Sequence, residues 1–403
     1  MSRPHAAALV EDAWHRQLEH GLRRRGWGNR VIAHMGYGST DTVRVFGRVV
    51  LGRDRSAQHE GDEPAGPDLT YGGMRSPYNR ARGWRAFLTA PAMNVPVAVT
   101  IGDQVFHARS DRSGHVDATF RDHGLEPGWH VVTLAASNAE PAEARVVIVR
   151  PEERFGLVSD IDDTVISTHL PRMMIAAWNT FVRHEGTRHV VPGMAPLYRE
   201  LLEQHPGAPV VYVSTGAWNT APTLTRFLRT QGFPLGPLLL TDWGPTNTGW
   251  FRSGQEHKRA ALHRLATEFP QIRWMLVGDD GQHDPKIYQE FAEARPEAVD
   301  SIAIRQLSAT EQVLSHGLPV SNEELTPRQY RAPKPVPVYY APDGYGLVRI
   351  LRAAGKLAAP AGYAAQAWDD PAGERLARES RAGVSRAGED RAGEALAGEP
   401  SDA

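Results

Sequence analysis

The spacing of apolar residues changes three times along the 403-residue chain. In the first segment apolar side chains recur every four positions, at Val10, Trp14, Leu18 and Leu22. Three arginines and Gly26 follow, so the pattern predicts an amphipathic helix that ends at the glycine. We favour packing of this helix on the protein's own core over docking on a membrane surface. Residues 1–40 are assigned to the helix and a linker.

The second segment, from Thr42 to about Arg150, carries short β-branched runs separated by Gly, Asp, Ser and Pro. These runs are TVRVFGRVVL, VPVAVTI, HVDATF, WHVVTLAA and ARVVIV. Runs of this kind are typical of strands, and the lack of helical stretches between them predicts antiparallel pairing. We therefore expect residues 41–150 to form a small antiparallel, β-sandwich-like domain. Nothing in this segment indicates catalysis.

The third segment begins at Phe155, where strand and helix patterns alternate. The apolar runs are FGLVSD, PVVYVS, PLLLTDW, RWMLVGD and DSIAIR, with helical stretches such as APLYRELLEQ and HKRAALHRLATEF between them. This alternation predicts an α/β fold, with a Rossmann-like parallel sheet covered by helices on both faces. Residues 151–318 are assigned to this domain, and residues 319–359 to a C-terminal extension that packs on its core. Ligands of such sheets bind at the carboxyl ends of the strands.

The last segment, residues 360–403, is rich in Ala, Gly, Glu and Arg and repeats Arg-Ala-Gly with a period of five. It offers almost no large apolar side chains to offset the entropy of ordering, so we expect a disordered tail.

The composition of the chain excludes several kinds of partner and of site. The net charge of −2 creates no general attraction to nucleic acid, and we expect no nucleic-acid partner. The absence of cysteine excludes disulfides, thiolate zinc sites and cysteine nucleophiles. The N-terminal residues lack the apolar run of a signal peptide, and no stretch is apolar over the length of a bilayer span. We expect a cytoplasmic protein.

Acidic residues follow the first strand of the α/β region, in the sequence Asp160-Ile161-Asp162-Asp163-Thr164. Side chains two residues apart project to the same side of an extended chain. Close carboxylates stay ionised together when a cation lies between them, and hard oxygen ligands suit Mg²⁺. An aspartate is also a competent nucleophile towards phosphorus. Taken alone, the pair could equally cap the following helix.

Other strand ends supply complementary groups. RWMLVGD ends in Asp279-Asp280 with Asp284 four residues beyond, PVVYVS ends in Ser214, and Lys258 opens the helix before RWMLVGD. Helix capping explains each acidic pair separately, but it does not explain why both fall at one edge of the sheet. Carboxylates for a metal, with a hydroxyl and an ammonium for phosphate oxygens, form a set suited to phosphoryl transfer.

This order of motifs resembles that of the haloacid-dehalogenase superfamily. The matching residues are Asp160, Asp162 and Thr164 in the first motif, Ser214 in the second, Lys258 in the third, and Asp279 with Asp284 in the fourth. More narrowly, residues 155–310 resemble the phosphatidate-phosphatase catalytic domain of the actin-patch protein family. The stretches that carry this resemblance are SDIDDTV, VPGM, YVSTGAW, FRSGQEHK and VGDDGQHDPKIY. The second motif departs from the family's usual Ser-x-Ser-Pro-Trp, because here Thr-Gly-Ala-Trp follows Ser214.

The resemblance implies a Mg²⁺-dependent phosphatase that works through an aspartyl-phosphate. In this reading Asp160 is the nucleophile, and Asp162 protonates the leaving alkoxide and later activates water. The implied ligands of Mg²⁺ are Asp160, the backbone carbonyl of Asp162, and Asp279. Ser214 and Lys258 bind phosphoryl oxygens, Asp284 supports the metal or Lys258, and Thr164 stabilises the turn after the nucleophile. No role is assigned to Asp163 or Asp280.

The expected substrate is a phosphatidate-like lipid, which would bring the protein to the membrane periphery. The alternatives are a soluble phosphoester, or a catalytically weak lipid-binding module on the same fold. Met174, Trp178 and Phe181 fall near one helical face of a short insertion. We favour a cap helix packed on its own domain over a lipid-facing lip. The arginine-rich run from Arg75 to Arg85 is either a solvated surface or a site for anionic headgroups.

Overall fold

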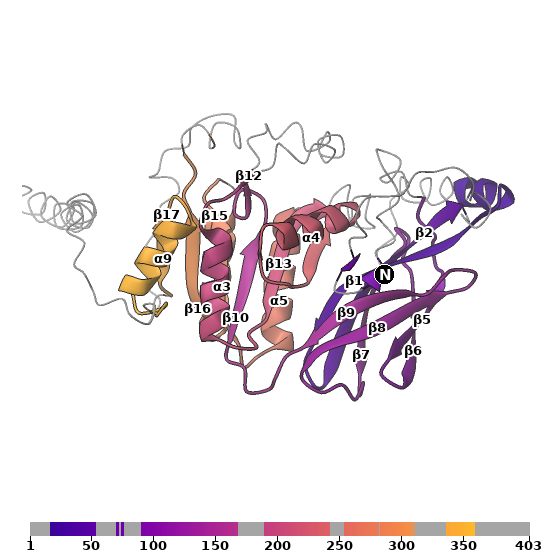
Figure 1. The fold of residues 1–403 in the computed structure, drawn as a ribbon, viewed down its shortest axis with the longest axis horizontal. Helices are drawn as coiled ribbons and strands as arrows, with labels where there is room; N and C mark the ends of the chain where they lie inside the picture. Colours follow the sequence, from indigo (N-terminus) through magenta and orange to yellow (C-terminus); the bar gives the residue numbers. More distant parts are fainter. Residues whose placement is uncertain are drawn as a thin grey trace, which may run out of the picture. The chain divides into compact units, whose positions relative to one another are not determined.

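The computed structural model in Figure 1 describes most of the chain. The described residues are 17–53, 70–71, 74–75, 90–167, 189–241, 254–281, 283–308, 311 and 336–358. The described residues from 17 to 357 belong to one compact unit. Several predictions concern residues outside the described ranges: Val10 and Trp14 of the N-terminal helix, the arginines beyond Arg75, the insertion with Met174, Trp178 and Phe181, and the tail from residue 360.

Seven strands of the N-terminal half form one sheet. They are β1 (Trp27–Gly38), β2 (Thr42–Arg53), β5 (Pro96–Ile101), β6 (Gln104–Arg109), β7 (His115–Arg121), β8 (Gly128–Ala136) and β9 (Ala142–Ile148), in the order β6-β5-β8-β9-β1-β2-β7. The rings of Phe106 on β6 and Phe120 on β7 lie 4.9 Å apart, so the two edge strands approach each other and the sheet is rolled. Its interior holds alternating valines such as Val43, Val45 and Val97. A separate two-stranded hairpin is formed by β3 (Thr70–Tyr71) and β4 (Met74–Arg75).

This β domain differs from the sequence prediction in several respects: its seven strands belong to one rolled sheet, where we expected a sandwich, and β6 lies outside the predicted runs. Strand β1 lies within residues 1–40, where we predicted only a helix and a linker. Its sequence, WGNRVIAHMGYG, alternates poorly and contains glycines, which weakens the strand signal. In addition, β1 pairs with β9 in parallel, although the other strand pairs of the sheet are antiparallel. Pairing with its sequence neighbour β2 and with the distant strand β9 stabilises β1 despite its weak pattern.

The second half of the chain forms the predicted parallel sheet. Its strands are β10 (Phe155–Asp160), β13 (Val210–Ala217), β14 (Leu238–Thr241), β15 (Arg273–Asp279), β16 (Val299–Arg305) and β17 (Val338–Ala341), in the order β14-β13-β10-β15-β16-β17. Neighbouring strands in this sheet pair in parallel. All six residues of β10 are buried, as expected for a central strand with both faces covered. The α/β fold class is confirmed for the described residues.

Helices lie between these strands and after the last of them (Figure 1). They are α3 (Met194–Gln204), α4 (Ala221–Thr230), α5 (Gly254–Glu268), α6 (Asp284–Ala294) and α9 (Gly344–Ala353), with short 3₁₀ turns η4 (Trp218–Thr220) and η5 (Pro296–Ala298). Right-handed crossovers place α3 and α4 on one face of the sheet and α5 and α6 on the other. The C-terminal extension is part of this domain, because it supplies the edge strand β17, so the predicted domain boundary at residue 318 is wrong. An ion pair of 2.6 Å between Arg352 and Glu200 also joins α9 to α3.

The rolled sheet contacts the α/β sheet through aromatic and polar side chains. Trp218 of η4 lies against Phe46 of β2, with a ring distance of 5.5 Å, and against His34 of β1 at 4.9 Å. The Tyr37 hydroxyl donates a 2.7 Å hydrogen bond to Glu268 at the end of α5. Both Tyr37 and Phe46 belong to the hydrophobic core that also contains the residues of β10. The β domain therefore supports the segment that follows Ser214.

Among the described residues, no helix has the length and apolar composition needed to cross a bilayer.

Candidate active site

The loop after β10 presents the first acidic motif. Asp160 ends the strand, and the chain then turns back so that the amides of Val165 and Ile166 donate to the Ile161 carbonyl at 2.9 and 3.0 Å. Asp163 has a φ of 59°, in the left-handed region that aspartate tolerates better than most residues. Two-stranded pairing of β11 (Ile166–Ser167) with β12 (His189–Val190) closes the loop. The tight turn keeps Asp162 near the end of β10.

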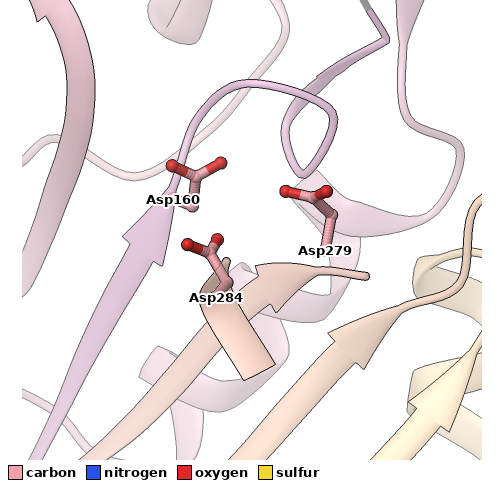
Figure 2. Close-up of side chains that lie close together, drawn as sticks. All are labelled: Asp160, Asp279 and Asp284. Carbon is pink, nitrogen blue, oxygen red and sulfur yellow. The ribbon is translucent and has the colours of Figure 1, made fainter. Parts of the chain in front are cut away.

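Three buried carboxylates converge at the carboxyl edge of the sheet (Figure 2). Asp160 comes from the end of β10, Asp279 from the end of the neighbouring strand β15, and Asp284 from the first residue of α6. One oxygen of each lies within 4.8 Å of the others. Gly278 makes this approach feasible, because a Cβ atom there would lie 2.6 Å from Asp284 Oδ2. Steric hindrance therefore explains why a glycine precedes Asp279 in the fourth motif.

Lys258, at the start of α5, is the cation of this cluster in the described part of the chain. Its Nζ lies 2.6 Å from Asp160 Oδ1 and 2.5 Å from Asp284 Oδ1, and the lysine is only 4% exposed. Burial alone lowers the pKa of a lysine, but the adjacent carboxylates of Asp160 and Asp284 outweigh it and raise the pKa of Lys258. Lys258 is therefore charged at neutral pH.

A single ammonium does not satisfy three carboxylates. Asp160 Oδ2 and Asp284 Oδ2 are buried and accept no hydrogen bond from any described residue. Burial, together with the neighbouring carboxylates, raises the pKa of both Asp160 and Asp279. Buried anionic oxygens of this kind are costly unless a cation or a proton neutralises them. The residues therefore fit a divalent metal with hard oxygen ligands.

Asp162 and Ser214 form a second pair beside the carboxylates. Ser214 Oγ donates to Asp162 Oδ2 at 2.9 Å and accepts from the Gly216 amide at the same distance. Burial raises the pKa of Asp162, and the bond from Ser214 lowers it only in part. A carboxyl group that retains its proton more readily than usual can donate that proton to a leaving group.

The structure places every predicted site residue at one edge of the sheet. Thr164 Oγ1 contacts Asp279 Oδ2 at 3.5 Å, and Asp284 touches both Lys258 and the carboxylate cluster directly. The cluster of carboxylate oxygens comprises Asp160, Asp279 and Asp284, whereas the Asp162 carboxylate faces Ser214. The metal role of the Asp162 backbone carbonyl, like the other assigned roles, stays a prediction.

Sequence reasoning missed Arg305 at the end of β16. Its guanidinium donates to the Asp163 carbonyl at 2.7 Å and pairs with Glu311 at 2.5 Å. The strand-end residues predicted to be functional were acids and a hydroxyl. Applied to cations, the same rule would have singled out the arginine that ends DSIAIR. Asp280, which had no assigned role, accepts a 2.7 Å hydrogen bond from the Leu307 amide just beyond Arg305.

An aspartate at the end of a central parallel strand, with a lysine and further acids around it, resembles the site of haloacid-dehalogenase-like phosphatases. Residues 155–306 match the family model described as phosphatidate phosphatase APP1, catalytic domain. The match confirms the resemblance inferred from the motifs and supports a phosphatase.

Two curated relatives extend the comparison. The chain is 29% identical over 171 residues to phosphatidate phosphatase APP1 of Saccharomyces cerevisiae, a match that covers 42% of this chain and 29% of that protein. It is 26% identical over 154 residues to an uncharacterised protein of Schizosaccharomyces pombe, covering 38% of this chain and 25% of that protein. The chain thus spans less than a third of the length of these relatives.

Solved structures align only loosely. An uncharacterised protein from Listeria monocytogenes serotype 4b aligns with a TM-score of 0.29 and 12% identity, over 50% of this chain and 99% of that one. The HAD domain of effector protein Lem4 from Legionella pneumophila aligns with a TM-score of 0.26 and 14% identity, over 38% of this chain and 85% of that one. At these scores the alignments support no inference about site or substrate.

Proposed function

We propose that this protein is a Mg²⁺-dependent phosphatase that hydrolyses a phosphomonoester through an aspartyl-phosphate on Asp160. The observation that carries the proposal is the state of the Asp160 carboxylate. One of its oxygens is held 2.6 Å from Lys258 Nζ, and the other has no hydrogen-bond partner among the described residues. A carboxylate that is oriented by a cation and keeps one oxygen uncommitted is suited to nucleophilic attack.

The first chemical step transfers the phosphoryl group to the protein. An oxygen of Asp160 forms a bond to phosphorus, and the bond between phosphorus and the leaving oxygen breaks. Asp162 gives its proton to that oxygen, so the product leaves as a neutral alcohol. Lys258 and the Ser214 hydroxyl lie next to Asp160 and Asp162 respectively, where they can donate to phosphoryl oxygens.

The second step reverses the role of Asp162. Its carboxylate takes a proton from water, the water oxygen attacks phosphorus, and the bond from phosphorus to Asp160 breaks. Inorganic phosphate is released and the Asp160 carboxylate is restored. Mg²⁺ held by Asp160, Asp279 and the backbone carbonyl of Asp162, with Asp284 in support, would neutralise charge between nucleophile and phosphate.

The proposed substrate is a phosphatidate-like lipid. Support comes from the match of residues 155–306 to the APP1 catalytic domain and from the similarity to the yeast phosphatidate phosphatase. A cytoplasmic protein that contacts the membrane peripherally is part of the same proposal. The insertion with Met174, Trp178 and Phe181 is a candidate for that contact.

The test compares the wild-type protein with Asp160→Asn on phosphatidate in mixed micelles and on a panel of soluble phosphoesters. Wild-type turnover should require Mg²⁺ and stop when a chelator is added, and fluoroberyllate should inhibit it by mimicking the aspartyl-phosphate. An amide cannot attack phosphorus, so Asp160→Asn should lower turnover by about 10⁴-fold or more. Asp103→Asn, the same change at an exposed turn, serves as the control and should be fully active.

Two results would contradict the proposal at different levels. If Asp160→Asn kept more than about a tenth of wild-type turnover, Asp160 would not be the nucleophile. If the wild-type protein ignored phosphatidate but hydrolysed a soluble phosphoester quickly, the lipid substrate would be wrong and the phosphatase chemistry would stand.

A further inference from the structure

The buried Arg305 and the partly buried Glu311 form an ion pair beside the catalytic loop. Arg305, the last residue of β16, is 6% exposed, and its Nη2 lies 2.5 Å from Glu311 Oε1. Its other donors reach backbone oxygens: Nη1 bonds the Asp163 carbonyl at 2.7 Å, and Nε bonds the Pro342 carbonyl at 3.3 Å. These side-chain contacts lie outside the carboxylate cluster, and the guanidinium reaches the catalytic loop through the Asp163 carbonyl.

Glu311 ties further groups into the same network. Its Oε1 accepts from Ser167 Oγ at 3.2 Å, and its Oε2 accepts from both the amide and the hydroxyl of Ser308 at 2.9 Å. Burial alone raises the pKa of a glutamate, but the bonds from Arg305 and Ser308 lower the pKa of Glu311 to about 2. Glu311 is therefore an anion at every pH at which the protein would be assayed.

The two residues hold both ends of one short loop. Residues 161–167 contain the general acid Asp162, and Arg305 binds the loop at Asp163 while Glu311 binds it at Ser167. Asp163 has a left-handed φ of 59°, a conformation that costs energy outside glycine. A charge-assisted bond to its carbonyl offsets that cost and orients the peptide between Asp163 and Thr164, one residue beyond Asp162.

We propose that Arg305 and Glu311 act as a clamp that positions Asp162 for proton transfer to the leaving group. Arg305 is a positioning residue, because it acts through the Asp163 carbonyl and touches no reacting atom. The role rests on the proposed phosphatase function. Arginine suits this place because its planar fork donates in several fixed directions at once, whereas a lysine ammonium on a flexible stem cannot span the same acceptors.

The clamp has a structural readout that does not depend on catalysis. The amides of Asp163, Val165 and Ile166 are hydrogen-bonded within the loop. Hydrogen–deuterium exchange of a peptide covering residues 161–167 should become at least about tenfold faster in Arg305→Met, because the loop opens more often. Arg352→Met, which removes the α3–α9 ion pair instead, should leave exchange in this peptide unchanged.

A comparison of kcat/KM on two substrates distinguishes positioning of Asp162 by Arg305 from a general structural role of Arg305. A leaving group such as 2,4-dinitrophenolate needs no proton, whereas an alkoxide does. For an alkyl phosphate, Arg305→Met should reduce kcat/KM by about 30–100-fold, within the range that general acids contribute. For 2,4-dinitrophenyl phosphate the loss in kcat/KM should stay below about threefold. Glu311→Gln and Arg305→Lys should show the same selectivity with smaller losses.

Each outcome tests a different part of the proposal. Unchanged exchange at residues 161–167 in Arg305→Met would overturn the clamp, whatever the activities. Faster exchange with equal losses of kcat/KM on both phosphates would overturn the positioning of Asp162, because a general acid acts selectively. A wild-type protein that hydrolyses neither phosphate, nor any phosphoester of the panel, would overturn the proposed function and the catalytic role of the clamp with it.

Discussion

Replacing the nucleophile should stabilise the metal-free protein while abolishing turnover. Asp160 is 1% exposed and lies beside Asp279 and Asp284, and one of its carboxylate oxygens has no partner among the described residues. In the absence of a divalent cation this arrangement concentrates negative charge in a buried place. Asp160→Asn removes one of the charges with almost no change in shape. Catalytic sites commonly carry such a cost in stability.

The expected gain in the free energy of unfolding is the balance of opposing contributions. An unsatisfied buried polar oxygen costs about 1–3 kcal/mol, and more when it is charged. The substitution also weakens the ion pair with Lys258, but that lysine keeps Asp284 as a partner at 2.5 Å. We expect a net gain of about 1–2 kcal/mol in the free energy of unfolding. For a domain of this size that gain corresponds to a rise in Tm of about 2–8 °C.

The effect should depend on pH in a defined direction. Burial raises the pKa of Asp160 above its value in the unfolded chain, about 3.9. Between these two pKa values the folded protein binds more protons than the unfolded one, so the free energy of unfolding of the wild type falls as pH rises. Below about pH 4 Asp160 is neutral in both states. The advantage of Asp160→Asn should therefore be largest at neutral pH and vanish near pH 4.

Thermal unfolding in chelator, with Asp103→Asn as the matched exposed control, measures this effect. Addition of Mg²⁺ should raise the Tm of the wild type above that of Asp160→Asn. A cation present at 100 times its Kd stabilises the wild type by about 2.7 kcal/mol, and the variant lacks one of the ligands. If Asp160→Asn lowered Tm in chelator at neutral pH, or if Mg²⁺ stabilised both proteins equally, the reasoning about the carboxylate cluster would be refuted.

Three further substitutions test neighbouring parts of the site. Lys258→Met should cost about 3–5 kcal/mol in chelator, because it leaves buried charges unpaired, and Mg²⁺ should restore part of that loss of Tm. Gly278→Ala should displace Asp284 by a fraction of an ångström or more and reduce kcat by about 10²-fold, with little change in far-UV circular dichroism. Trp218→Ala should cost about 3–5 kcal/mol by thermal unfolding and lower kcat by loosening the segment after Ser214; unchanged Tm would contradict its packing role.

Local sequence patterns predicted much of the site. FGLVSD and RWMLVGD are apolar runs that end in acids, and this pattern predicts buried strands whose polar ends meet at one sheet edge. Lys258 was recognised by its place at the start of a helix between two such strands. These predictions succeeded because a strand's burial and its polar terminus are both encoded within a few consecutive residues.

Local patterns failed to predict features that depend on contacts between residues far apart in the sequence. Strand β1 has weak alternation of its own and is ordered by β2 and by β9, more than a hundred residues away. In the sequence Trp218 was only the tryptophan that ends the second motif, yet in the structure it packs on His34 and Phe46 of the β domain. No local signal encodes such contacts, because both partners must first be folded.

The sequence by itself therefore determined the strand ends and the chemical groups they bear, including Asp160, Asp279 and Lys258. The tertiary structure decided how those groups combine: it brought Asp284 onto both Lys258 and the carboxylate cluster, and it placed Arg305 on the carbonyl of Asp163, 142 residues earlier. The physical reason is the range of the forces involved. Burial patterns and turns are set by neighbouring residues, whereas hydrogen bonds and ion pairs act over a few ångströms between groups that only the packed sheet brings together.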